Sequence, residues 1–368
     1  MGFQIKNVFS LFSGKDVIGI DLGKSSIKIV RLKKSGSSWT VVNCHWEELP
    51  PKLWNPENQN LEDIRSELSK KIRDILNRKF SGVNRFSTTL NGNQVIVRNV
   101  KFPKIKKEEL EKNLQFEAEP YIAFDIRDVY LAFQILKEAE EEGEQKWESI
   151  LVGVKKELLD QRLSFFQELG LKPVVVDVDA FSIQNLYELN SDDFAQNTIL
   201  FLNIGSSVTN ILITEKGYPK VARDLLMGGY DITRTLMNTL RLEVEEAEEL
   251  KKKYGIVSSM DLQNMDDPEK AEEVSTIVTN IANELLNEVR RSLDYFHTVS
   301  EHEGEINRIV LSGGGSKLRN LEKYLQAQLN FPVEFLDPWK KIKQPEDALI
   351  KEKGLDLAVA LGTALRNG

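Results

Sequence analysis

One short pattern occurs twice in this chain, once near the start of each half. VIGIDLGKSSIKIV, at residues 17–30, and TILFLNIGSSVTNILI, at residues 198–213, each contain an apolar stretch, a glycine-serine turn and a second apolar stretch. Most of the apolar residues are β-branched, which favours strands. Gly23 is expected to take the positive φ that other residues resist. Two copies of one strand–turn–strand unit predict two related lobes that face each other.

The turn of the first copy has the composition of an anion site. Backbone N–H groups in such a turn are unpaired, and Lys24 and Lys28 place positive charge beside Gly23, Ser25 and Ser26. A turn that only joins two strands is the alternative interpretation, and it is the more common one.

A third glycine-rich turn, IVLSGGGSKLRNLEKYL, occupies residues 309–325. A strand is expected at its start and a helix from about Leu318. The adjacent glycines let the backbone approach a neighbour closely before the helix begins. A tight strand-to-helix connection is the alternative for this turn alone. Three such turns in one chain favour a shared binding site.

The amino-acid composition is typical of a multidomain globular protein and argues against several functional classes. The chain has 368 residues, of which 41% are apolar and 29% charged, so two or three domains with substantial cores are expected. The net charge of −8 argues against a nucleic-acid partner. The single cysteine, Cys44, has no internal disulfide partner, which indicates a reducing compartment. No uncharged run reaches the length of a membrane span, about eighteen residues.

The alternation of strand and helix patterns predicts an α/β protein with mixed sheets. Asn91-Gly92-Asn93 is expected to be the turn of a hairpin between strands at 86–90 and 95–102. The acidic run EAEEEGE is expected to be a solvated hairpin loop. The predicted divisions are a first lobe at 1–195 with a small α+β insert at about 86–154, a second lobe at 196–345 with a helical subdomain at about 228–275, and a C-terminal helix within 346–368 that returns to the first lobe.

The N-terminal segment has a separate pattern. Ile5, Val8, Phe9 and Phe12 recur at the spacing of one helix face, which predicts a short amphipathic helix. It could dock on a partner or on the membrane surface. The alternative is a helix that packs on its own domain.

Several stretches together resemble one family. They are GIDLGKSSIKIV, FEAEPYIAF, KPVVVDVDAF, GGYDIT, EEAEELKKKYG, RRSLDYF, LSGGGSKLRNLEKYL and LAVALGTALR. In order and spacing they resemble the PilM family of type IV pilus assembly proteins, within the actin-like ATPase superfamily. The resemblance implies a two-lobed actin-like ATPase fold with a small α+β subdomain inserted in the first lobe, as in FtsA.

The resemblance also implies ATP and Mg²⁺ as cofactors. Asp21 would help to position the metal through water, and Lys28 would meet phosphate oxygens. Glu248 and Lys251 would flank the ribose and base, although a surface pair on a charged helix is the alternative for them. The glycines of the third turn would lie against the nucleoside. The full set of cofactor-binding residues implied is Asp21, Gly23, Lys24, Ser25, Ser26, Lys28, Asn203, Gly205, Ser206, Ser207, Glu248, Lys251, Gly313, Gly314, Gly315 and Lys317.

The second turn departs from the superfamily pattern. Its first strand usually ends in an aspartate, where this chain has Asn203. A neutral amide is a poorer Mg²⁺ ligand than a carboxylate and a poorer acceptor for an attacking water. Asp179 falls where related proteins place a water-positioning residue; a helix N-cap before Ala180 is the alternative. Binding of ATP is therefore expected to survive better than its hydrolysis.

The resemblance implies an ATP-binding cytoplasmic scaffold, peripheral at the inner membrane. Its expected partner is the cytoplasmic N-terminal tail of a bitopic PilN-like protein, together with other pilus inner-membrane proteins and self-association. Two alternatives share the fold: an FtsA-like filament-forming division protein and a small-molecule (sugar) kinase. Fold analogy alone does not choose among them.

Overall fold

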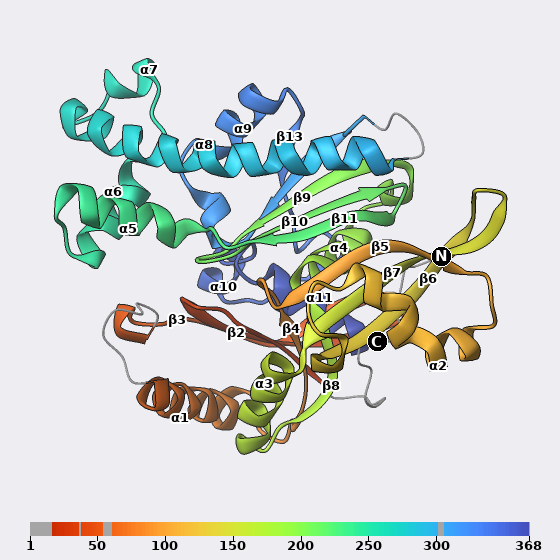
Figure 1. Ribbon diagram of the computed structural model, residues 1–368. Coiled ribbons are helices and arrows are strands. Elements are labelled where there is room, and N and C mark those ends of the chain that lie inside the picture. Colours follow the sequence, from red (N-terminus) through yellow and green to blue (C-terminus); the bar gives the residue numbers. More distant parts are fainter. Residues whose placement is uncertain (1–16, 37, 54–60, 301–304, 368) are drawn as a thin grey trace.

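The computed structural model describes residues 17–36, 38–53, 61–300 and 305–367. The predicted amphipathic helix with Ile5, Val8, Phe9 and Phe12 lies outside these residues. Within them the strands form three sheets, and two of these face each other across a central pair of helices (Figure 1).

The first sheet has six strands in the order β14-β3-β2-β1-β4-β8. β1, β2 and β3 form an antiparallel meander, and β4 and β8 add in parallel on the other side of β1. The strands are β1 (Ile18–Leu22), β2 (Ser26–Ser35), β3 (Ser38–Glu48), β4 (Arg85–Leu90), β8 (Lys172–Val178) and β14 (Ile342–Lys343).

The second sheet repeats this arrangement in the order β11-β10-β9-β12-β13. β9, β10 and β11 form the meander, and β12 and β13 add in parallel beside β9. The strands are β9 (Thr198–Ile204), β10 (Thr209–Glu215), β11 (Tyr218–Leu225), β12 (Arg308–Ser312) and β13 (Val333–Phe335). The repeat seen in the sequence therefore extends to five strands of each sheet, and β14 is an additional edge strand of the first sheet.

Two buried helices, α4 (Asp179–Asn190) and α11 (Ala358–Ala364), lie between the sheets (Figure 1). Their side chains share one apolar cluster with residues of both sheets, such as Val30 and Phe201. Both helices are buried on almost every side, so they lack the polar stripe of a surface helix. The position of one lobe relative to the other therefore depends on this helix pair.

Amphipathic helices cover the outer faces of both sheets. α1 (Leu61–Lys79) and α3 (Lys156–Glu168) pack on the first sheet. α8 (Pro268–Val299) crosses the second sheet, beside α9 (Leu321–Leu329) (Figure 1). Among the residues described, no helix combines the length and the apolar character needed to cross a membrane.

The third sheet is small and has the order β5-β7-β6. Its strands are β5 (Val95–Pro103), β6 (Val129–Glu141) and β7 (Glu144–Lys155), with α2 (Lys107–Ala118), η3 (Glu119–Tyr121) and η4 (Ile126–Asp128) packed beside them. The chain enters this sheet from β4 and leaves it directly into α3.

The hairpin predicted for residues 86–102 is wrong. β4 pairs with β1 and β8, whereas β5 pairs with β7 in the small sheet. Gly92, with φ +94°, turns the chain out of the first sheet, and its N–H donates to Asp224 Oδ2 at 2.6 Å. The small sheet thus begins at Val95 and not at residue 86.

The acidic run is mostly strand and not loop. β6 continues to Glu141 and β7 begins at Glu144, so only Glu142 and Gly143 connect them. Both have positive φ, +53° and +81°, as in the tight turns whose twist matches that of a β-ribbon. The acidic side chains therefore line the exposed end of the ribbon.

A helical segment follows β11. It contains α5 (Gly229–Leu240), α6 (Val244–Tyr254) and α7 (Ser259–Leu262). The remaining short elements are η1 (Pro51–Leu53), η5 (Phe194–Gln196), η6 (Gly314–Lys317), α10 (Ala348–Glu352) and η7 (Leu365–Asn367). The division into lobes and subdomains stays a prediction.

Candidate functional site

A cleft of about 630 Å³ opens where the turns of the two large sheets meet. Every site residue predicted from the sequence lines this cleft, although those residues come from separate parts of the chain. They are Asp21, Gly23, Lys24, Ser25, Ser26, Lys28, Asp179, Asn203, Gly205, Ser206, Ser207, Glu248, Lys251, Gly313, Gly314, Gly315 and Lys317. The structure brings them together; their individual roles stay predictions.

The two repeated turns are closed by the same type of backbone hydrogen bond. In the first, Gly23 N donates to Ser26 O at 3.1 Å, and in the second, Gly205 N donates to Val208 O at 2.9 Å. Gly23 does not have the positive φ that we predicted. A Cβ on Gly23 would lie 3.0 Å from Lys28 Nζ, and one on Gly205 would lie 2.9 Å from Val208 O. Close approach to the backbone explains Gly205, whereas the nearest neighbour of Gly23 is the movable end of a lysine side chain.

The third turn is held against the end of β9. Gly313 has φ +81°, and a Cβ there would lie 2.4 Å from Ile204 O. A Cβ on Gly315 would lie 2.6 Å from Ile204 Cγ2, and one on Gly314 would lie 3.0 Å from Asp356 Oδ1. The protein's own packing is therefore a sufficient reason for Gly313 and Gly315, whereas the neighbour of Gly314 is a side-chain oxygen that can move.

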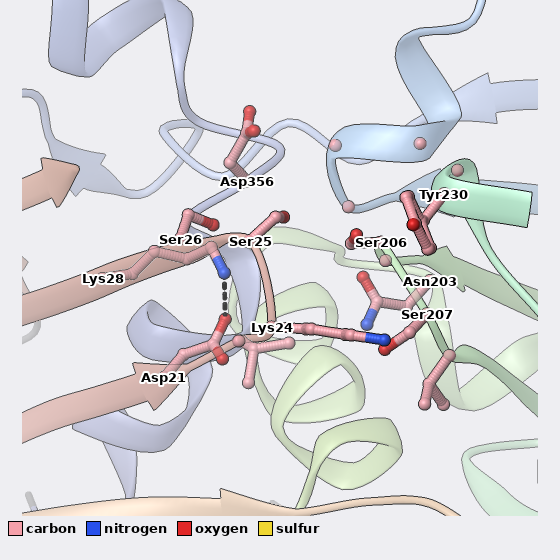
Figure 2. Close-up of a pocket in the computed structure, with 18 of the residues that line it drawn as sticks. Asp21, Lys24, Ser25, Ser26, Lys28, Asn203, Ser206, Ser207, Tyr230 and Asp356 are labelled. Carbon is pink, nitrogen blue, oxygen red and sulfur yellow. Dashed lines mark ion pairs between the residues drawn. The ribbon is translucent and has the colours of Figure 1, made fainter. Parts of the chain in front are cut away.

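Positive charge reaches the cleft from the first turn. Lys28 Nζ pairs with Asp21 Oδ2 at 2.9 Å, and both side chains are largely buried (Figure 2). Lys24 points across the cleft, with its Nζ 5.4 Å from the ring centre of Tyr230 at the start of α5 (Figure 2). In the described part of the chain, no carboxylate lies within ion-pair distance of Lys24. Its ammonium group is available to an anion in the cleft.

Glu248 and Lys251 are not a simple surface pair. Lys251 Nζ pairs with Glu248 and donates to Thr233 Oγ1 at 2.8 Å and to Gly229 O at 3.0 Å. Burial lowers the pKa of Lys251. Thr233, which the sequence analysis did not single out, also donates to Glu248. This network fixes α6 against α5 at one end of the cleft.

Lys317 connects the third turn to the segment before α11. Its Nζ pairs with Asp356 Oδ2 and donates to Glu352 O at 3.3 Å. Asp356 lines the cleft near Ser25 and Ser26 (Figure 2). Lys317 is therefore already neutralised by the protein, unlike Lys24.

Asp179 is the first residue of α4, and its side chain is buried. The N-cap is Val178, and no side-chain cap bond forms, so the alternative role of Asp179 as an N-cap is wrong. Asn91 Nδ2 donates to Asp179 Oδ2 at 2.6 Å, while Oδ1 has no partner in the described part of the chain. Burial, and then the charge of Asp21, raise the pKa of Asp179 to about 7.

This raised pKa gives a pH prediction. The folded state holds a proton on Asp179 that the unfolded chain releases near pH 4, so stability from this group is lost as pH rises from about 4 to about 7. Asp179→Asn stays neutral, so its free energy of unfolding relative to wild type should increase between pH 5 and pH 8. Urea denaturation at both pH values measures this, with the exposed Asp294→Asn on α8 as control. Equal increments for the two variants would contradict the prediction.

Asn203 belongs to a buried hydrogen-bond chain. Ser312 Oγ donates to Asn203 Oδ1 at 3.2 Å, and Asn203 Nδ2 donates to Asn210 Oδ1 at 2.7 Å. Asn210 Nδ2 then donates to Asp224 Oδ1 at 2.7 Å, and Asp224 Oδ2 accepts the Gly92 N–H. Both polar side-chain atoms of Asn203 thus form hydrogen bonds within the protein.

The cleft offers few metal ligands of its own. Across the ranges that the structure describes, no group of three or more His, Cys, Asp or Glu side chains is placed to hold a metal ion. Carboxylates that line the cleft beside the first turn include Asp21, which pairs with Lys28, Asp356, which pairs with Lys317, and Glu48, which lies opposite Ser26 in the sheet. A hard cation here would take most of its oxygen ligands from a bound anion and from water.

Several lining residues carried no signal in the sequence. Arg162 lies in the middle of a helix and Asn91 in a loop, and neither belongs to a repeated pattern. Tyr230 lies within GGYDIT and Asp356 directly precedes LAVALGTALR. The family resemblance therefore included nearby residues but assigned no role to these two.

Comparison with known proteins identifies relatives over nearly the whole chain. The model of a family described as "Type IV pilus assembly protein PilM" matches residues 19–368. A solved structure described as a "PilM-PilN type IV pilus biogenesis complex" superimposes with a TM-score of 0.79 at 28% sequence identity, covering 95% of this chain and 98% of that chain.

More distant structures share the fold alone. MreB5 of Spiroplasma citri bound to ADP gives a TM-score of 0.55 at 13% identity, covering 95% of both chains. The ethanolamine utilization protein EutJ from Carboxydothermus hydrogenoformans gives 0.52 at 13% identity, covering 96% of this chain and 90% of that chain. The predicted two-lobed actin-like α/β fold is confirmed.

Proposed function

Because the chain belongs to the family of the type IV pilus assembly protein PilM, we propose that it is an ATP-binding scaffold of the pilus assembly platform. The observation that carries the nucleotide part is the convergence of three glycine turns with Lys24 and Lys28 in one cleft. The observation that carries the scaffold part is the likeness to a solved PilM–PilN complex.

The two ends of the cleft suit different parts of ATP. Backbone N–H groups of the repeated turns, with Lys24 and Lys28, would hold phosphate oxygens. Ser206 and Ser207 would contribute from the second lobe. The Glu248–Lys251 network and the third turn would border the nucleoside. A related structure of MreB5 of Spiroplasma citri is described as bound to AMPPNP, which supports a nucleotide in this fold.

Mg²⁺ would supply charge neutralisation at the phosphates, with Asp21 as its contact through water. The side chain of Asn203 is an amide that is hydrogen-bonded to Asn210 and Ser312, and Asp179, with a pKa of about 7, is only partly ionised near neutral pH. Hydrolysis needs charge placed for the transition state, which this chain supplies poorly. ATP would therefore act as a structural ligand with slow turnover.

The partner would be the cytoplasmic N-terminal tail of a PilN-like bitopic protein, which would place this chain at the cytoplasmic face of the inner membrane. Contacts with other pilus inner-membrane proteins and self-association stay predictions. The family assignment favours this scaffold over the filament-forming and kinase alternatives. Capture of a bitopic protein by its short cytoplasmic tail would support it, whereas steady ADP production with a sugar would contradict it.

Replacing Lys28 tests the nucleotide site. Lys28→Ala removes one charge-assisted hydrogen bond to phosphate, so ATP binding should weaken by roughly 1–2 kcal/mol. Isothermal titration calorimetry with Mg²⁺ measures the change. The control is Lys33→Ala, which removes an exposed lysine from the same strand. If Lys28→Ala binds ATP as tightly as the control, the assignment of the phosphate end is wrong.

A further inference from the structure

Arg162 is a positively charged residue of the cleft that has few interaction partners among the residues that the structure describes. It projects from α3 and lines the cleft beside the first turn. Its Nη1 donates to Leu22 O at 3.5 Å, at the limit of a hydrogen bond. In the described part of the chain, no carboxylate lies within ion-pair distance of its guanidinium.

This lack of a partner is unusual for a partly buried arginine. Arg162 is partly buried, and this burial lowers the pKa of its guanidinium. Charged groups taken from water are normally paired, because an unpaired buried charge is costly. Asp21 and, where it is ionised, Asp179 lie near enough to raise the pKa of Arg162, but neither forms an ion pair with the guanidinium. An anion that enters the cleft would complete the pairing.

The position of Arg162 indicates which anionic group of a bound nucleotide it would contact. Its neighbours Leu22, Asp21 and Asp179 surround the first turn, whereas Glu248 and Lys251 lie with α5 and α6 in the helical segment of the second lobe. If the nucleoside lies beside α6, this corner receives the end of the phosphate chain. A guanidinium presents a planar set of donors that matches phosphate oxygens.

We propose that Arg162 binds the terminal phosphate of ATP and makes the cleft discriminate ATP from ADP. The inference rests on the proposed nucleotide function. α3, from which Arg162 projects, is packed on the first lobe, because Phe165 and Phe166 are buried in the core and Arg65 binds Glu168 at 2.6 Å. A donor held on a packed helix loses little freedom when it binds.

The test is the ratio of ATP to ADP affinity. In Arg162→Gln, ATP affinity should fall roughly ten- to hundred-fold, as for loss of a charged hydrogen-bond donor, while ADP affinity stays within about twofold. Arg162→Lys keeps the positive charge but loses the planar set of donors, so its ratio of ATP to ADP affinity should lie between those of wild type and Arg162→Gln. The control is Arg65→Gln, which removes another arginine that contacts α3, but outside the cleft; its ratio should equal that of wild type.

The outcomes separate the two proposals. If wild type binds neither ATP nor ADP, the proposed nucleotide function fails. If wild type binds both, and Arg162→Gln loses affinity for both equally or for neither, only the role of Arg162 is overturned. Should Arg162→Gln not fold, arginine modification of wild type by phenylglyoxal replaces it. Protection of Arg162 by ATP and not by ADP supports the proposal, and equal protection overturns it.

Discussion

Gly362→Ala is expected to destabilise the fold by roughly 3 kcal/mol or more, near the upper range for overpacked cores. Gly362 lies in α11, where the helix crosses α4, and an added Cβ would stand 1.8 Å from the backbone oxygen of Ser182. Both helices lie between the two large sheets, and Ser182 Oγ lies 2.8 Å from Thr363 Oγ1. To admit one methyl group the helices would have to separate.

Equilibrium unfolding in urea measures this loss. Gly229→Ala in the first turn of α5 is the matched control, because its added Cβ would meet its nearest atoms at 3.7 Å, an ordinary contact distance. The control should stay within about 1 kcal/mol of wild type, given the helix preference of alanine. Equal stability of the two variants would mean that α11 and α4 are not packed as described.

Asn203→Asp is the second change with a large expected effect. A carboxylate at this position would place an oxygen against Asn210 Oδ1, where Asn203 Nδ2 now donates at 2.7 Å. If the Asn210 amide turned over to donate, its oxygen would face Asp224 instead. In either orientation two buried oxygens face each other with no hydrogen between them. The free energy of unfolding is therefore expected to fall by roughly 2–4 kcal/mol.

A second substitution should rescue this loss. When Asn203→Asp is combined with Asp224→Asn, the chain of bonds can reverse its direction. The new carboxylate at position 203 then accepts from the amide of Asn210, whose oxygen accepts from the new amide at position 224. The Gly92 N–H can still donate to an oxygen at position 224. Urea unfolding of wild type, both single variants and the double variant gives a double-mutant cycle. The coupling free energy between the two substitutions should exceed about 1 kcal/mol. Simple addition of the two single effects would contradict the hydrogen-bond chain.

The sequence indicated the fold because its strongest signals are local. The repeated strand–turn–strand unit corresponds to β1–β2 and β9–β10, and the strands beside them follow the same order in both sheets except for the additional β14. The same glycine turns, combined with the family resemblance, pointed to seventeen residues that line one cleft. Local motifs place such residues because turn geometry depends on a few neighbours.

Features that depend on distant contacts were not predictable. Residues 86–102 have the pattern of a hairpin, but a bond between Gly92 and Asp224, far along the chain, directs β5 into another sheet. Asn203 looks replaceable by aspartate until its bonds to Asn210 and Ser312 are known. Arg162 belongs to no motif, and only the tertiary structure brings it to the cleft.

The central claim is that both repeated turns hold one ATP molecule. Hydrogen–deuterium exchange with and without Mg²⁺ and ATP tests it most directly, because amides that bind phosphate exchange more slowly. The account predicts slower exchange in peptides covering residues 22–27 and 204–209 together, and weaker protection of both in Lys28→Ala at an ATP concentration near the wild-type Kd. Protection of only one turn, or of neither while ATP binds, would contradict it.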